Sequence, residues 1–292
     1  MKKLFVCGTI ICCALFAKAQ NPQDTTWKYG GVFAVNLSQV SLSNWSAGGQ
    51  NTISFDFMMN YDINYKFEKI MWLNRFEFGY GLNKTKNEGT KKTNDRLYIS
   101  SNYGYKIGPK WYMSVLSTFN TQFAKGFNYP KKDGDMHISK FMAPGYLSVG
   151  TGFTWIPNTW LTASFSPAAW RGIFVTDSYL SDLGAFGVKK GKKLKSEFGG
   201  QVKFEAKREI LPNMKLYSRL ELFSDYLDKP RNIDILWDVQ LNMQINKWVS
   251  ANIATNLLYD HNTKMETNDS GTVKGAKVQF KEVLSIGIQF QI

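Results

Sequence analysis

The sequence predicts an all-β fold, a transmembrane antiparallel up-and-down β-barrel of about twelve strands. Residues 51–67 alternate aromatic or aliphatic side chains with polar ones almost without interruption. A strand here would be apolar on one face and polar on the other. Its length is about three times the soluble average of five to six residues. Lipid on one side and a wet interior on the other suit such a strand.

The N-terminus predicts export. Two lysines precede an apolar stretch over residues 4–16, and Ala17-Lys18-Ala19 follows it, which is the pattern of a secretory signal peptide. We therefore expect residues 1–19 to be a signal peptide and residues 20–292 to form one outer-membrane barrel. All three cysteines lie in the leader. The mature chain would then have no disulfide, and a closed hydrogen-bonded wall would have to stabilise it.

Eleven further stretches read as strands of the same kind. They are residues 28–40, 71–84, 96–107, 111–123, 143–156, 160–175, 196–210, 214–224, 233–245, 248–260 and 277–292. An even total places both termini on one side of the membrane. The mean hydropathy of −0.29 agrees with this prediction, because a barrel confines its apolar residues to alternate positions.

The connections alternate between short and long. After even-numbered strands they are residues 68–70, 108–110, 157–159, 211–213 and 246–247. After odd-numbered strands most are long and polar, namely residues 85–95, 124–141, 176–195 and 261–276. Barrels of the bacterial outer membrane have short periplasmic turns and longer extracellular loops. We therefore expect that location and that orientation.

Tryptophans lie at the strand ends beside the short turns and predict a periplasmic aromatic girdle. They are Trp72, Trp111, Trp155, Trp160 and Trp248. The last strand alternates apolar and polar residues up to Phe290 and Ile292. It looks like the C-terminal signal that outer-membrane barrels present to the barrel assembly machinery, so we expect that machinery as a partner.

Two prolines predict irregularities. Pro144 can begin its strand, whereas Pro167 falls inside one. A closed barrel has no free edge for a residue without an N–H donor. We expect a bulge, or an exit from the membrane, near Ser166. A proline that shapes a pore constriction is the functional alternative.

Six short motifs together resemble a known family. They are residues 44–49, 141–146, 165–167, 184–188, 258–260 and 287–292. The set is similar to an uncharacterised secreted family of Bacteroidota labelled domain of unknown function 3078, over nearly the whole mature chain. The resemblance implies an outer-membrane location and supplies no activity and no catalytic residue. The role of the Asn44–Gly49 loop stays open, with a tight loop cap favoured over a phosphate cradle, which would need a following helix.

No catalytic group is predicted. The only histidines, His137 and His261, fall in predicted outer loops. An outer-membrane lipid hydrolase needs a histidine beside a serine. The nearest candidates are His137 with Ser139, and Asp260 with His261. We expect no enzyme activity, no cofactor and no metal. Loop aspartates could supply only flexible oxygen ligands for calcium; they are Asp177, Asp182, Asp260 and Asp269.

The chain is basic, with a formal net charge of +13, which falls to about +10 when the three leader lysines are removed. Much of this charge lies in predicted outer loops. The lysines concerned are Lys84, Lys86, Lys91, Lys92, Lys131, Lys132, Lys189, Lys190, Lys192, Lys193 and Lys195. Exposed basic clusters attract anions. At this location we expect outer-membrane lipid and lipopolysaccharide as partners, and no nucleic acid.

The inward register is charged but balanced in sign. The predicted lumen-facing charges are Asp56, Asp62, Lys66, Arg75, Glu77, Lys106, Lys203, Glu205, Arg219, Glu221, Asp234 and Asp238. A strongly selective pore would have rings of one sign. Balanced charges instead suit a small, weakly selective pore or an interior closed by ion pairs.

Two functions therefore stay open. The first, which the sequence slightly favours, is a narrow passive channel for small solutes. The other is a non-conducting barrel that acts as a structural or assembly partner in an outer-membrane complex. A lipid hydrolase is less favoured. A continuous water path through the lumen would favour the channel, and a filled lumen would favour the partner.

Overall fold

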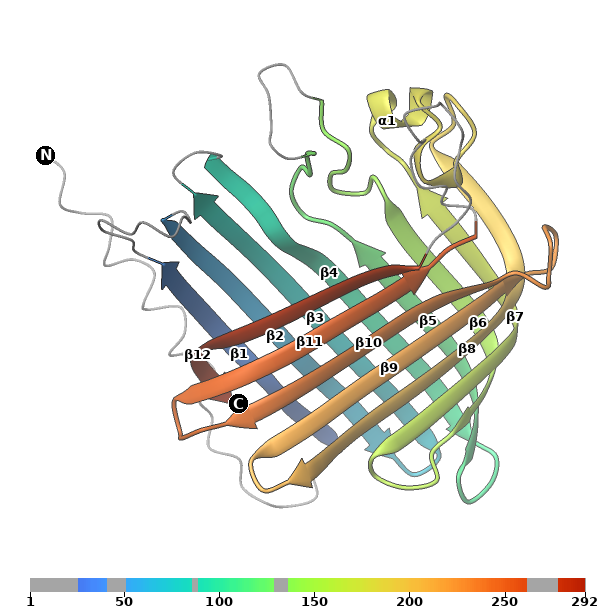
Figure 1. Cartoon of the computed structure of the whole chain (residues 1–292). Helices are drawn as coiled ribbons and strands as arrows, with labels where there is room; N and C mark the ends of the chain where they lie inside the picture. Colours follow the sequence, from blue (N-terminus) through green and yellow to red (C-terminus); the bar gives the residue numbers. More distant parts are fainter. Residues whose placement is uncertain (1–25, 41–50, 86–88, 129–135, 262–277, 292) are drawn as a thin grey trace, which may run out of the picture.

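The computed structural model describes residues 26–40, 51–85, 89–128, 136–261 and 278–291. These residues form a closed antiparallel barrel whose neighbouring strands follow each other in the chain. Figure 1 shows this order as a continuous change of colour around the wall, with α1 at the long-loop end and the short turns at the opposite end. The predicted fold class and strand number are confirmed.

Most strands begin and end within two residues of the prediction. They are β1 (Trp27–Val40), β2 (Thr52–Phe67), β3 (Ile70–Thr85), β4 (Gly89–Lys106), β5 (Trp111–Thr121), β6 (Gly145–Trp155), β7 (Leu161–Phe174), β8 (Leu194–Leu211), β9 (Met214–Asp225), β10 (Ile233–Gln244), β11 (Val249–Tyr259) and β12 (Gln279–Gln291). A short helix, α1 (Ser178–Asp182), and a 3-10 turn, η2 (Ala185–Gly187), lie between β7 and β8. Within the described residues, no helix is long and apolar enough to cross a membrane.

The prediction of a long loop over residues 85–95 is wrong. Strand β4 begins at Gly89, and it pairs with β3 as far as Thr85 opposite Gly89. The polar residues after Gly89 continue a hairpin, because strand pairing does not require apolar side chains. The turns are also shorter than expected, since Ile70 and Leu211 belong to β3 and β8. The residues left between these strands include Glu68 and Asn213, both with positive φ.

Pro167 lies in a bulge, one of the two predicted outcomes. The pairing of β7 with β8 shifts register between Ser166 and Ala169, and the strand then continues to Phe174. On the other side, the pairing with β6 shifts at Gly152. A Cβ at Gly152 would lie 2.0 Å from the carbonyl oxygen of Phe165. The bulge therefore needs a glycine on the neighbouring strand.

The wall separates apolar from polar side chains. Register pairs such as Asp62 with Arg75 and Arg219 with Asp238 share the inner face. The opposite register carries exposed apolar residues, among them Phe55, Trp237 and Ile286. Transmembrane barrels have such an outer surface, because it contacts hydrocarbon.

A small apolar cluster lies at the long-loop end. It consists of Ala143, Ile173, Val175, Leu180 and Val188, with Tyr146, Ala185 and Phe186 packed against it. The segment that carries α1 and η2 is therefore folded onto the ends of β6 and β7. The predicted signal peptide, its cysteines and the Asn44–Gly49 loop lie outside the described residues.

Candidate functional site: an ion-pair layer across the lumen

Three ion pairs join strands that lie directly opposite each other in the barrel. Asp62 of β2 contacts Lys207 of β8, with 2.5 Å between Oδ2 and Nζ. Glu77 of β3 contacts Arg219 of β9. Each pair of strands is six positions apart in either direction around the ring.

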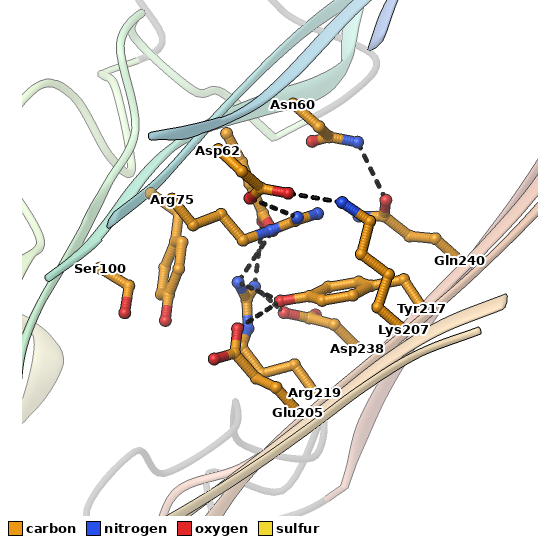
Figure 2. Close-up of polar contacts among 12 residues, drawn as sticks. Asn60, Asp62, Arg75, Ser100, Glu205, Lys207, Tyr217, Arg219, Asp238 and Gln240 are labelled. Atoms are coloured by element: carbon orange, nitrogen blue, oxygen red, sulfur yellow. Dashed lines mark hydrogen bonds and ion pairs between the residues drawn. The ribbon is translucent and has the colours of Figure 1, made fainter. Parts of the chain in front are cut away.

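The third such pair joins β4 and β10. The Nη1 and Nη2 atoms of Arg96 lie 3.0 and 2.7 Å from the two carboxylate oxygens of Asp238. Side chains that meet across a full diameter must occupy the lumen between the two walls. Figure 2 shows Asp62, Lys207, Arg219 and Asp238 converging from opposite walls in this way.

Arg219 is the centre of the layer. Its Nη1 and Nη2 atoms lie 2.9 and 3.0 Å from the two carboxylate oxygens of Glu77, and Nη2 also donates to Asp238. The guanidinium carbon lies 3.7 Å from the centre of the Tyr98 ring. The side chain of Arg219 is 0% exposed. A buried arginine needs this degree of pairing, because desolvation of an unpaired charge costs several kcal/mol.

Arg75 extends the layer toward the short turns. Its Nε donates to Glu77 at 2.6 Å, and its Nη1 donates to Asp62 at 2.9 Å. The guanidinium lies over the ring of Tyr217, 3.8 Å from the centroid. Planar stacking and two carboxylate partners use the geometry that distinguishes arginine from lysine.

Neighbouring polar groups complete the layer. The Nζ of Lys203 donates to Ser100 at 2.6 Å and lies 3.1 Å from Glu205. The hydroxyl of Tyr98 donates to Glu221 at 2.5 Å. We call Arg75, Glu77, Arg96, Tyr98, Arg219 and Asp238 the central ion-pair layer. Its side chains and their partners cross the lumen from one wall to the other at this height.

A cavity of about 740 Å³ lies on the short-turn side of the layer. Arg75 and Tyr217 form its floor, and turn residues such as Glu68 and Asn158 lie at its mouth. Its wall carries Lys28 and Lys66, both exposed to solvent. We call it the short-turn cavity.

A smaller cavity of about 140 Å³ lies on the other side, lined in part by Tyr98, Glu221 and Arg171. Arg171 is ion-paired there: its Nε donates to Glu197 at 2.5 Å, and its Nη2 donates to Asp234. Its guanidinium lies 3.9 Å from the centre of the Phe223 ring. We call this the long-loop cavity.

Strand pairing places all the predicted lumen charges on the inner register. Asp62, Arg75, Glu77, Arg219 and Asp238 meet in one network. Among the twelve predicted lumen charges, those without an ion pair within the described part are Asp56, Lys66 and Lys106. Asp56 accepts a hydrogen bond from Asn94 at 3.2 Å, and Lys66 lines the short-turn cavity.

The sequence prediction omitted residues that are central to the site. Arg96 and Tyr98 have the same strand parity as the predicted Lys106, so alternation alone could have identified them. Glu197 likewise shares the parity of Lys203 in β8. Arg171 could not be found in this way, because the bulge at Pro167 reverses the alternation in β7.

The predicted girdle tryptophans lie at the short-turn end. Trp111 and Trp155 stack with 6.1 Å between ring centroids, and Trp248 packs edge-on against Phe290 at 5.8 Å. Trp72 is exposed, and Trp160 also lines the mouth of the short-turn cavity.

The histidine candidates do not form a nucleophile–base pair in the structure. The Nε2 of His137 lies 3.2 Å from Asp177, whereas Ser139 donates to Gln122. The backbone N–H of His261 donates to Asp234. No group of three or more His, Cys, Asp or Glu side chains in the described part could hold a metal ion.

Asp177 connects the loops at the long-loop end. Its carboxylate accepts from Lys140 at 2.8 Å and from the backbone N–H of Leu180 at 3.1 Å, where it caps α1. The hydrogen bond from Lys140 is the main cause that lowers the pKa of Asp177 to about 2. The carboxylate is therefore ionised at neutral pH.

Two of the predicted outer-loop lysines are ion-paired. Lys92 lies 2.6 Å from Asp95 and is 13% exposed, and Lys195 lies 2.7 Å from Glu197. Lys189, Lys190, Lys192 and Lys193 remain exposed after η2. Lys86, Lys131 and Lys132 lie outside the described residues.

Solved structures similar to this chain are bacterial barrels. The translocator domain of autotransporter NalP from Neisseria meningitidis has a TM-score of 0.37 and 10% identity, covering 92% of this chain and 90% of that one. The COG4313 outer membrane channel from Pseudomonas putida F1 has a TM-score of 0.39 and 11% identity, covering 94% and 100%. The NanC porin has a TM-score of 0.37 and 8% identity, covering 89% and 98%.

The family comparison is more specific. No curated protein matches the sequence. The motifs expected after residue 127 lie outside the residues that match a family model. Residues 37–127 match the model described as protein of unknown function, DUF3078, which confirms the predicted resemblance over that part of the chain.

Proposed function

We propose that this protein is an outer-membrane β-barrel that does not conduct, and that it acts as a structural or assembly partner at the cell surface. The observation behind the proposal is the complete burial of Arg219 between Glu77 and Asp238 in the middle of the lumen. A contact of this kind across the lumen would hinder the passage of solutes unless it separated.

The proposed membrane location is based on the outer surface of the barrel wall. A closed barrel with an exposed apolar outer face and tryptophans at one end is typical of outer-membrane proteins. Short turns at that end would face the periplasm, and α1 with its basic neighbours would face outward. The exposed lysines from Lys189 to Lys193 would then meet lipopolysaccharide phosphates, since basic clusters attract anions.

Passive passage of small solutes is the alternative. Polar cavities on both sides of the layer favour it, because each would form half of a water path. Opening that path would require Arg219 and Arg96 to leave their carboxylates together. Loss of one partner from a buried ion pair costs about 3–5 kcal/mol, so the open state would be rare without an external trigger.

Enzymatic activity forms no part of the proposal. The mutual positions of His137, Ser139 and Gln122 offer no activated nucleophile. A hydrolase would need the base within hydrogen-bond reach of the hydroxyl.

Liposome swelling tests the proposal. Purified protein is reconstituted into liposomes that are then diluted into isotonic arabinose. We expect the swelling rate of protein-free liposomes. Swelling that rises in proportion to the amount of protein would contradict a closed lumen and establish the channel.

A further inference from the structure

We propose that the short-turn cavity binds a phosphorylated ligand through Lys28 and Lys66. The cavity holds about 740 Å³, and small-molecule sites are roughly 300–1,000 Å³. It is closed at its floor by the central ion-pair layer and reached from the short-turn end. A ligand could therefore enter and leave without crossing the barrel.

The two lysines are close neighbours on the inner wall. Lys28 of β1 lies opposite Asn64 in β2, and Lys66 lies two residues further along β2 on the same face. Diagonal neighbours of this kind are roughly 7–8 Å apart. Within the described residues, neither ammonium has an ion pair or a hydrogen bond to a side chain. Two like charges in this position repel each other unless an anion lies between them.

The carboxylates of the cavity are already engaged or lie at its mouth. Asp62 pairs with Arg75 and Lys207. Glu205 pairs with Lys203 and accepts from Tyr217. Glu68 is exposed in the turn after β2. The inner surface therefore keeps two free positive charges and no free carboxylate to neutralise them.

The donor set favours phosphate. Lysine ammoniums bind phosphate as point charges, whereas carboxylate is better matched by the planar fork of arginine. The arginine of this cavity, Arg75, is already occupied by acids.

Two amides add further donors. The Oδ1 atoms of Asn64 and Asn158 accept backbone N–H groups, which leaves their NH₂ groups for a ligand. The exposed ring of Trp160 lies at the same mouth. The ligand class is thus a small molecule or head group that carries one or two phosphates.

Isothermal titration of the purified full-length barrel with inorganic pyrophosphate tests the site. We expect binding at low ionic strength, and a loss of affinity of at least tenfold in Lys28→Gln/Lys66→Gln. The control, Lys69→Gln/Lys110→Gln, removes two lysines from turns at the same end that do not line the cavity. We expect its affinity to stay within twofold of the wild type. Circular dichroism melting checks that both variants keep the barrel.

A second arm separates a soluble ligand from a lipid head group. Native mass spectrometry from micelles doped with phosphatidylglycerol would show retained lipid in the wild type and not in the cavity variant if the head group binds. Titration with glycerol phosphate gives the corresponding result for a soluble ligand. No pyrophosphate binding, or an equal loss in both double variants, would overturn the proposal. The outcome is independent of liposome swelling, because the site needs no open lumen.

Discussion

The short-turn cavity and the long-loop cavity lie on opposite sides of the central ion-pair layer and differ in charge. The short-turn cavity is lined by four cations and three carboxylates, and two of its lysines are unpaired. The long-loop cavity is lined by a single cation, Arg171, among three carboxylates, Glu221, Asp234 and Asp260. It is also about a fifth of the size, and a segment with its own apolar cluster lies at its end of the barrel.

The difference shows why a sum over lumen charges is misleading. The inward residues balance in sign along the sequence, but they are not balanced in space. Acids and arginines are concentrated in the central layer and beyond it, where they are buried and paired. Lys28 and Lys66 remain at the wet end, where a free ammonium costs little, because water and flexible stems keep it solvated. One half of the lumen thus holds charges that are buried and paired, and the other half retains two lysines without an ion pair in the described residues.

The largest expected contrast is between single charge removals in the two cavities. Arg171→Gln removes the main partner of Asp234 and one of the two partners of Glu197. It should lower the free energy of unfolding by about 3–5 kcal/mol. Lys66→Gln should change it by less than about 0.5 kcal/mol. Denaturant unfolding in lipid vesicles, followed by tryptophan fluorescence, measures both; equal effects would contradict the comparison.

The contrast between the two cavities requires that Asp238 and Gln240 of β10 face the lumen. Val239→Arg would then place a charge on lipid and cost about 2–4 kcal/mol if the residue lies near the midplane. Gln240→Arg would stay in the polar interior, where Asn60 donates to Gln240 at 3.0 Å, and should cost clearly less. The same unfolding assay applies. Equal tolerance of arginine at the two positions would refute the assigned faces.

A smaller effect is expected at low pH, which should destabilise the long-loop end of the barrel and leave the short-turn end unchanged. The lowered pKa of Asp177, about 2 against an ordinary value of 3.8, contributes stability above about pH 4 that is lost as the pH falls toward 2. Hydrogen exchange of residues 175–193 should therefore rise in that window while the short turns stay unchanged. Asp177→Asn keeps the cap of α1 but loses the ion pairs, so its exchange in this segment should already be raised at pH 5. Wild-type exchange that does not change between pH 4 and 2 would count against this role.

The alternation of apolar and polar residues predicted the strands of the barrel wall well, but it predicted only part of the candidate site. In β2 and β10 the polar and apolar residues alternate so regularly that both faces follow from the sequence. Strand β4 starts earlier than predicted, because Gly89 to Asn94 pair with β3 without an apolar face. Arg171 was not predicted to face inward, because a bulge in β7 reverses the alternation of inward and outward residues after Ser166. Side-chain alternation assigns a face, but only while the register is unbroken.

The pairing inside the lumen could not be predicted from one sequence. Glu77 and Arg219 are 142 residues apart, and they meet because their strands lie across a twelve-stranded ring. In a ring of ten or fourteen strands the same residues would have other neighbours. The sequence showed that opposite charges would face inward, and barrel closure decided which of them form the layer.

Single-channel recording in planar bilayers tests the closed lumen most directly. Wild-type protein should show no conductance steps. Arg219→Ala removes the side chain that joins the two walls and should produce steps. Lys207→Ala, at a position that is 62% exposed below the layer, should remain as silent as the wild type. Stable conductance of the wild-type protein, or steps of equal size in all three proteins, would contradict a lumen closed by the central ion-pair layer.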